Sequence, residues 1–159
     1  MGGSALIYQE KFQAHLAESF IHLNRLNNAI TALEKKYTFL LTPSEFKEMI
    51  VHDQDLAFSD QVIYRFSKLQ DCMGAKLFKS YLLSQGENVD KPFLDILNQL
   101  EKLQILNVDK WFELRDIRNS IAHHYEDDVN VTMGLVNMIY KSRNDLDNIL
   151  KALQSARTG

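Results

Sequence analysis

The residues best suited to chemistry lie close together in the last third of the chain, in the run Arg118-Asn119-Ser120-Ile121-Ala122-His123-His124-Tyr125. Arginine is a permanent planar cation whose donors match phosphate oxygens. Histidine titrates near neutral pH and is the most common general acid or base. Together these two side chains can support cleavage of a phosphodiester without a metal ion.

The spacing within this run limits how the side chains could cooperate. On a regular helix Arg118 and His123 point about 140° apart around the axis. Asn119 and His123, four residues apart, share a face, so the amide could orient the imidazole; Arg118 and Tyr125, seven apart, also share a face. A phosphate held by both Arg118 and His123 therefore requires a bend or helix end near residues 121–124, or a second copy of the chain.

Two other interpretations use the same residues. Arg118 could pair with nearby acids (Glu113, Asp116 or Glu126), leaving both histidines solvated in a last helical turn, where the helix dipole favours them. A metal site could use His123, His124 and the acids that follow. Zinc sites on one helix prefer histidines four residues apart, however, and adjacent histidines point about 100° apart. We therefore expect neither a metal nor a cofactor.

The elements that must position this cluster are helices. Apolar residues recur every three or four positions, and no segment alternates as a strand does. The pattern predicts helices over residues 10–37, 43–50, 56–86, 92–103, from 109 into the cluster, and 127–153. We expect an all-α, up-and-down bundle of four long helices plus a short one.

Local signals mark several helix ends. Thr42, Pro43 and Glu45 form the pattern of a capping box with proline at the first helical position. Residues 52–55 should form a bend, and Gly86 should end the second long helix. Asp109 is expected to cap the helix that carries the cluster.

Length and composition predict a single domain. The 159 residues suit one domain, expected at 9–155 after a flexible leader at 1–8. Cys72 is the only cysteine, which excludes an internal disulfide and predicts a reducing, cytoplasmic location. No apolar run approaches the roughly 20 residues of a membrane span. The net charge of −3 argues against a broad nucleic-acid-binding surface, so phosphate binding would need a local patch.

With Asn119 after the arginine, the pattern Arg118-x4-His123-x-Tyr125 resembles the signature of the HEPN superfamily. It is most similar to the HepT-like toxins, which are encoded beside a minimal nucleotidyltransferase (MNT) antitoxin. The resemblance extends over most of the chain. It implies a homodimeric helical bundle whose two motifs face each other in a cleft, metal-independent cleavage of RNA, and an antitoxin that attaches AMP to the motif tyrosine.

The resemblance also implies a role for each motif residue. Arg118 would stabilise the negative charge of the transition state, and His123 would act as acid or base on the 2′-hydroxyl or the leaving 5′-oxygen. Asn119 would be a polar support and Tyr125 the modification site or a substrate contact. His124 is the alternative to His123, because longer spacings occur in the wider superfamily; the His-x-Tyr spacing favours His123.

Further candidates lie outside the motif. Asp60, Tyr64 and Arg65 could belong to the cleft, although a solvated position near a bundle end is the favoured interpretation of Asp60. Basic residues could line one mouth of the cleft: Lys110, Arg115, Arg118, Lys141 and Arg143. Apolar residues of the motif helix are expected at the dimer interface: Trp111, Leu114, Ile117 and Ile121. The competing function is a helical dimer that binds nucleotide, substrate or the nucleotidyltransferase with little turnover.

Overall fold

The computed structural model describes residues 2–124 and 128–156, and over these residues the all-α prediction is confirmed, with no strand. The elements are α1 (Gly2–Glu34), α2 (Pro43–Ile50), α3 (Asp53–Cys72), the π-helix η1 (Met73–Leu77), α4 (Phe78–Ser84), α5 (Phe93–Lys102), α6 (Val108–His124) and α7 (Val129–Ala156). None of the described helices is both long and apolar enough to cross a membrane.

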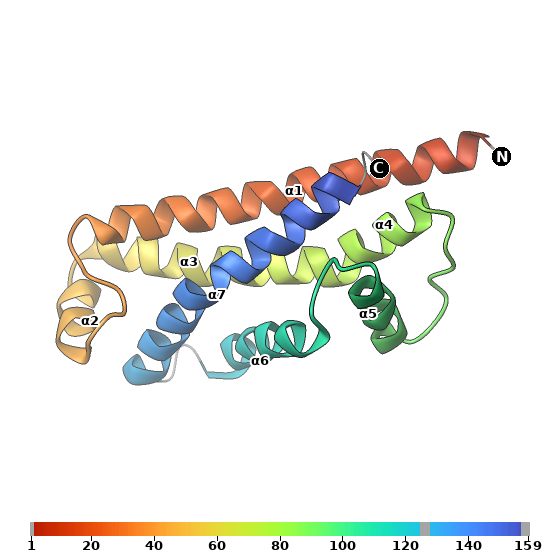
Figure 1. Ribbon diagram of the computed structural model, residues 1–159. Coiled ribbons are helices and arrows are strands. Elements are labelled where there is room, and N and C mark those ends of the chain that lie inside the picture. Colours follow the sequence, from red (N-terminus) through yellow and green to blue (C-terminus); the bar gives the residue numbers. More distant parts are fainter. Residues whose placement is uncertain (1, 125–127, 157–159) are drawn as a thin grey trace.

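Two long rods form the frame of the bundle. α1 runs antiparallel to a second rod made of α3, η1 and α4 in direct succession, and α7 crosses both in front (Figure 1). α6 and α5 lie below the second rod, on the side away from α1 (Figure 1). The motif helix α6 therefore packs against α3 and α7 rather than against α1.

The helix ends follow from local residues. At α2 the predicted capping box is confirmed: the Thr42 side chain accepts from the Glu45 backbone N–H, Glu45 reaches back, and Pro43 opens the helix. Gly86 follows α4 with a φ of 80°, a conformation that glycine adopts without strain. The predicted cap of α6 was misplaced by two residues, because Asn107, not Asp109, accepts the Lys110 backbone N–H at 3.0 Å.

The N-terminal residues differ from the expected leader. Residues 2–8 are helical and extend α1, whose side chains at positions 3–7 are exposed. Ser4, Ala5 and Leu6 contain no helix breaker, so hydrogen bonding along the helix continues past the last buried contact.

The apolar stripes meet in one core. The four apolar residues of α6 expected at a dimer interface belong to this core instead: Trp111, Leu114, Ile117 and Ile121 are 0, 1, 3 and 7 % exposed. That prediction was wrong because α3 and α7 already cover this face of α6. These residues offer no surface to a second copy of the chain.

The π-helical turn η1 lies where the second rod passes α6. Gly74, its second residue, leaves space for Trp111: a Cβ at position 74 would lie 3.3 Å from Trp111 Cζ2. The Trp111 ring in turn contacts Phe78 edge-on, with centroids 4.8 Å apart. A π-helical turn within an α-helix is rare and is often found at functional sites.

Candidate functional site

Arg118 is held by a carboxylate of another helix. Its Nε and Nη2 donate to the two carboxylate oxygens of Asp71 on α3, at 2.9 and 3.0 Å. The Arg118 and Asp71 side chains are 27 % and 51 % exposed, and these hydrogen bonds raise the pKa of Arg118 above its usual value. Of the acids expected from the sequence, Glu113 and Asp116 are not its partners, and Glu126 lies outside the described residues.

A hollow of about 340 Å³ opens beside this pair, between α3 and α6. Its lining includes Asp60 and Tyr64, both predicted as cleft residues, together with Ser67, Lys68, Asp71, Arg118, Ile63, Ile121 and Ala122. Its two cations, Arg118 and Lys68, face two carboxylates, so the lining has no net charge at neutral pH. The hollow can take a polar group but does not by itself concentrate anions.

Sequence reasoning missed Asp71, Ser67 and Lys68, although one signal was present. Positions 60, 64, 67 and 71 are polar and step by four, three and four, which places them on one face of α3. This polar face is the wall of the hollow opposite Arg118.

Arg65 lies outside the hollow. It faces α1, where its Nη1 is 3.0 Å from His22 Nδ1. Since arginine can only donate, Nδ1 of His22 accepts and its Nε2 carries the proton toward Glu18, 3.6 Å away. Burial, followed by the positive charge of Arg65, lowers the pKa of His22. Arg65 also lies over the Tyr64 ring, 5.2 Å from its centroid.

α6 continues without a break to His124. The helix bend considered near residues 121–124 is therefore absent, and positions 118 and 123 lie about 140° apart around the helix axis. Asn119, four residues before His123, is exposed. Tyr125, the expected modification site, lies outside the described residues.

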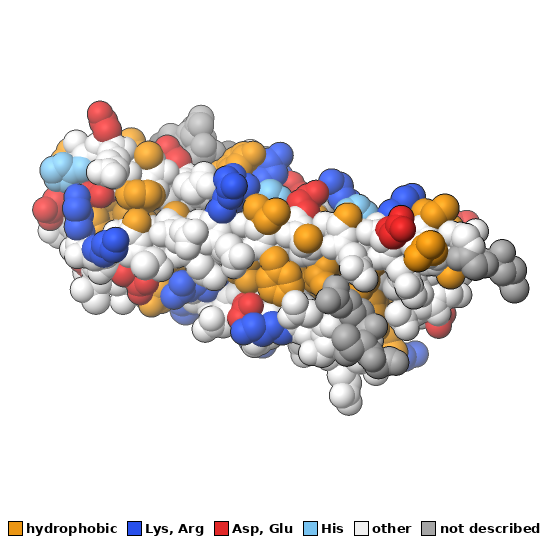
Figure 2. Space-filling view, turned by 90° about the horizontal axis from the view of Figure 1, so that it is seen from above, with side chains coloured by type: hydrophobic (Ala, Val, Ile, Leu, Met, Phe, Trp, Pro, Cys, Tyr) orange, Lys and Arg blue, Asp and Glu red, His pale blue; other side chains and the backbone are white. Residues whose placement is uncertain are grey.

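The basic residues considered for the mouth of the cleft do not converge. Lys110 pairs with Asp145 of α7 at 3.8 Å, Arg115 lies over the Phe93 ring of α5, and Arg143 lies over Tyr140 of α7. On the face shown in Figure 2, lysines and arginines are interspersed with acids and form no single basic patch. Arg118 is therefore the one member of that set in the hollow.

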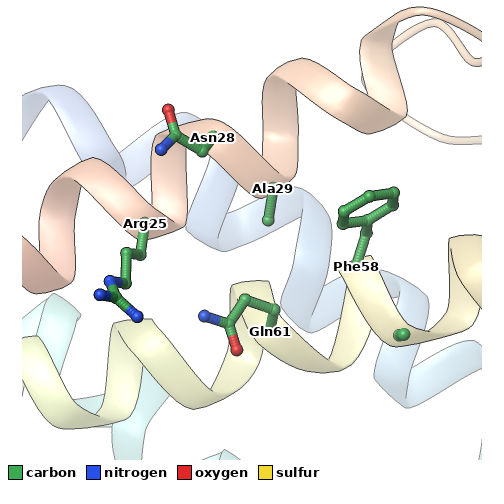
Figure 3. Close-up of a pocket in the computed structure, with 6 residues that line it drawn as sticks. Arg25, Asn28, Ala29, Phe58 and Gln61 are labelled. Atoms are coloured by element: carbon green, nitrogen blue, oxygen red, sulfur yellow. The ribbon is translucent and has the colours of Figure 1, made fainter.

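A second, wider hollow lies between α1 and α3. It encloses about 630 Å³ and is lined by Arg25, Asn28, Ala29, Ala57, Phe58 and Gln61. Arg25 and Gln61 point toward each other across it, Phe58 rises from α3 at one end, and Asn28 points away (Figure 3). It contains none of the predicted site residues.

Two nucleophiles near these helices are closed to substrate. Ser80 Oγ lies 3.0 Å from His15 Nδ1, but Ser80 is only 4 % exposed. Burial, with a hydrogen bond to Glu18, raises the pKa of Cys72 to about 11, so its thiol stays protonated at neutral pH. Among the described residues, no group of three or more His, Cys, Asp or Glu side chains is placed to hold a metal ion.

Comparisons with protein-family models, with curated proteins and with solved structures gave no match.

Proposed function

We propose that this chain is a HEPN-like, metal-independent endoribonuclease whose site combines the Arg118 hollow with His123. The observation that supports this most is the orientation of Arg118. Asp71 binds Nε and one N–H of Nη2, and a guanidinium carries five N–H donors. The remaining N–H groups, on Nη1 and Nη2, can bind a phosphate oxygen without the arginine having to become ordered first.

In this proposal the arginine and histidine have separate tasks. Arg118 stabilises the charge that builds up on the phosphoryl oxygens in the transition state. His123 transfers the proton, from the 2′-hydroxyl or to the leaving 5′-oxygen. Attack by the 2′-oxygen on phosphorus breaks the bond to the 5′-oxygen, so the products are a 2′,3′-cyclic phosphate and a free 5′-hydroxyl.

A homodimer is part of the proposal. α6 is helical from position 118 to position 123, and these positions lie about 140° apart around the helix axis. A symmetric pair of chains would allow Arg118 of one copy to face His123 of the other. The surface used must differ from the apolar face of α6, which is buried within the chain.

The test is incubation of the purified full chain with single-stranded RNA in the presence of EDTA, with separation of the products. We expect cleavage with 2′,3′-cyclic ends in the wild type, and a loss on the order of 10²-fold or more in Arg118→Ala and His123→Ala. Lys110→Ala, whose ion pair lies with α7, is the matched control and should retain full activity. An intact RNA substrate with the wild-type chain would contradict the proposal.

The second candidate is a binding partner of a minimal nucleotidyltransferase with little turnover. The balanced charge of the hollow favours it, because Asp60 and Asp71 offset Lys68 and Arg118 and weaken the attraction for a polyanion. In that case a stable complex with the nucleotidyltransferase would form while RNA stayed intact.

For either function, we propose control by AMP attached to Tyr125. The added phosphodiester would supply an anion near Arg118 that competes with a substrate phosphate.

A further inference from the structure

A third hollow adjoins the Arg118 hollow on the other side of Asp71. It measures about 260 Å³ and is lined by Gln70, Asp71, Gly74, Ala75, Phe93 and Arg115. Asp71 lines both hollows, so a ligand in one lies next to a ligand in the other. No residue of this hollow other than Asp71 belongs to the proposed catalytic site.

Gln70 supplies a buried hydrogen-bond donor without a partner at the wall of this hollow. The residue is 4 % exposed, and its Nε2 is buried without a partner among residues 2–124 and 128–156. Buried amide groups in folded proteins are nearly always hydrogen-bonded. An unpartnered amide beside a hollow is therefore suited to a ligand that brings its own acceptor.

Phe93 and Arg115 supply a platform for a flat ring. Phe93 is partly buried against the core, and the Arg115 guanidinium carbon lies 5.9 Å from the centroid of its ring. Aromatic faces and arginine planes are the surfaces on which unpaired bases stack. Gly74 of η1 forms another part of the lining, and the Trp111 ring packs against it from the core.

The volume of this hollow and the residues around it limit the kind of ligand that could bind. The volume lies just below the roughly 300–1,000 Å³ of a pocket for a drug-sized molecule, which suits a single flat base. Arg118 in the adjacent hollow offers donors to the phosphate attached to that base. Beyond Arg118, the half-exposed Tyr64 ring with Lys68 near it provides a second stacking surface.

We propose that the hollow of Gln70, Gly74, Phe93 and Arg115 binds one nucleobase, stacked on Phe93 and hydrogen-bonded to the Gln70 amide, with its phosphate directed to Arg118. The shared chemistry is that of a nucleotide, either free or as one unit of single-stranded RNA. Binding of a nucleotide within RNA rests on the proposed ribonuclease function, whereas binding of a free nucleotide does not.

Trp111, the single tryptophan, offers a direct readout. It is fully buried, and its Cζ2 lies against Gly74 in the wall of the hollow. We would titrate the full chain with AMP, with UMP and with a short single-stranded RNA, following tryptophan fluorescence and equilibrium dialysis. The variants are Phe93→Leu, Gln70→Met and Arg115→Gln.

The matched control is Phe112→Leu, which removes an exposed phenylalanine of α6 that lines none of the described hollows. We expect binding to weaken about tenfold in Phe93→Leu and to weaken in Gln70→Met, but to be unchanged in the control. Arg115→Gln alters an exposed residue and keeps the test valid if a core variant fails to fold. Tighter binding of RNA than of AMP or UMP would show that the bound base belongs to RNA, and equal binding would show that it belongs to a free nucleotide.

Several outcomes would overturn the proposal: no binding by the wild type at millimolar ligand, equal binding by all variants, or stronger binding of N-acetylphenylalanine amide, which would indicate a protein side chain as the occupant. Cleavage of the same RNA is measured separately. Base binding without cleavage contradicts only the ribonuclease function, whereas cleavage unaffected by Phe93→Leu excludes this hollow only as a site for a base of the RNA substrate.

Discussion

Asp71 binds the Nε edge of Arg118 through both carboxylate oxygens, which joins α3 to α6 at the motif. The partners are 47 residues apart in the chain. This contact fixes the plane of the guanidinium beside the hollow that Arg118 lines.

The first prediction concerns Asp71 as the residue that positions Arg118. Asp71→Asn should lower the RNA cleavage rate by roughly tenfold, less than Arg118→Ala, because the cation remains but loses its fixed orientation. The free energy of unfolding should change by less than about 1 kcal/mol, since a half-exposed ion pair contributes little to stability. Asp145→Asn, which removes the partner of Lys110, is the control. Faster RNA cleavage by Asp71→Asn would instead mean that the Asp71 carboxylate competes with the substrate phosphate for Arg118.

A second prediction distinguishes the adjacent histidines. His123→Ala should abolish most cleavage, on the order of 10²-fold or more, because the proton transfer is lost. His124→Ala should cost far less, since adjacent positions of a helix lie about 100° apart around its axis. Initial rates on one RNA substrate decide between them. Full activity in His123→Ala together with loss in His124→Ala would assign the chemistry to His124.

A third prediction tests the shared site between two copies. Arg118→Ala and His123→Ala chains, each inactive alone, should regain activity when mixed, because a mixed dimer keeps one intact pairing of Arg118 with His123. Statistical exchange in a symmetric dimer gives about a quarter of the wild-type rate. Light scattering at micromolar concentration should show a dimer. A monomer, or mixtures that stay inactive, would rule out the shared site.

The fourth prediction places the modification on Tyr125. Tyr125→Phe should keep the fold and at least part of the cleavage activity while escaping control by the nucleotidyltransferase. Mass spectrometry after co-expression should find AMP on Tyr125. Tyr140 is a poor acceptor, because its ring is stacked on Phe39 at 4.5 Å between centroids and covered by Arg143. An AMP adduct on Tyr64, which is 50 % exposed, would instead place the modification at the hollow beside Arg118.

The fifth prediction is a loss of stability below neutral pH. The pKa of His22 is lowered from 6.5 by burial and by Arg65. The unfolded chain therefore binds a proton first as the pH falls, and the free energy of unfolding should decrease below about pH 6.5. His22→Gln should flatten this slope between pH 6.5 and 5, measured by urea unfolding. His15, whose pKa is also lowered by burial, should leave a residual slope. An unchanged slope in His22→Gln would contradict the assignment.

Much of the fold could be predicted from the sequence because its signals are local. The capping box at Thr42, the stop at Gly86 and the acid at Asp128, whose side chain accepts the Asn130 backbone N–H at 2.7 Å, act within a few residues. Apolar periodicity likewise identified the helices. η1 was missed, because the change from α- to π-helix depends on how the rod packs beside Trp111.

The site could be predicted less completely because its contacts are long-range. Arg118 was identified from its motif, but the choice of Asp71 over the nearer acids depends on how α3 crosses α6. Asp60 and Tyr64 were placed at the hollow, whereas Arg65, one residue further on, turns to α1. Adjacent helical residues point about 100° apart around the axis, so an error of one position in assigning a helix face selects the wrong residue for the site.

The π-helical turn also fixes the rotational phase between the two parts of the long rod. Its i→i+5 hydrogen bonds take up one residue more than an α-helical turn, so α4 keeps nearly the phase that an uninterrupted α-helix one residue shorter would give it. Phe78, Tyr81 and Leu82 thus remain buried in the core, whereas one residue inserted or deleted in the α-helical part of the rod before them would turn them by about 100°. A Cβ at Gly74 within η1 would crowd Trp111, so both the length of this segment and its residue types help to determine the fold.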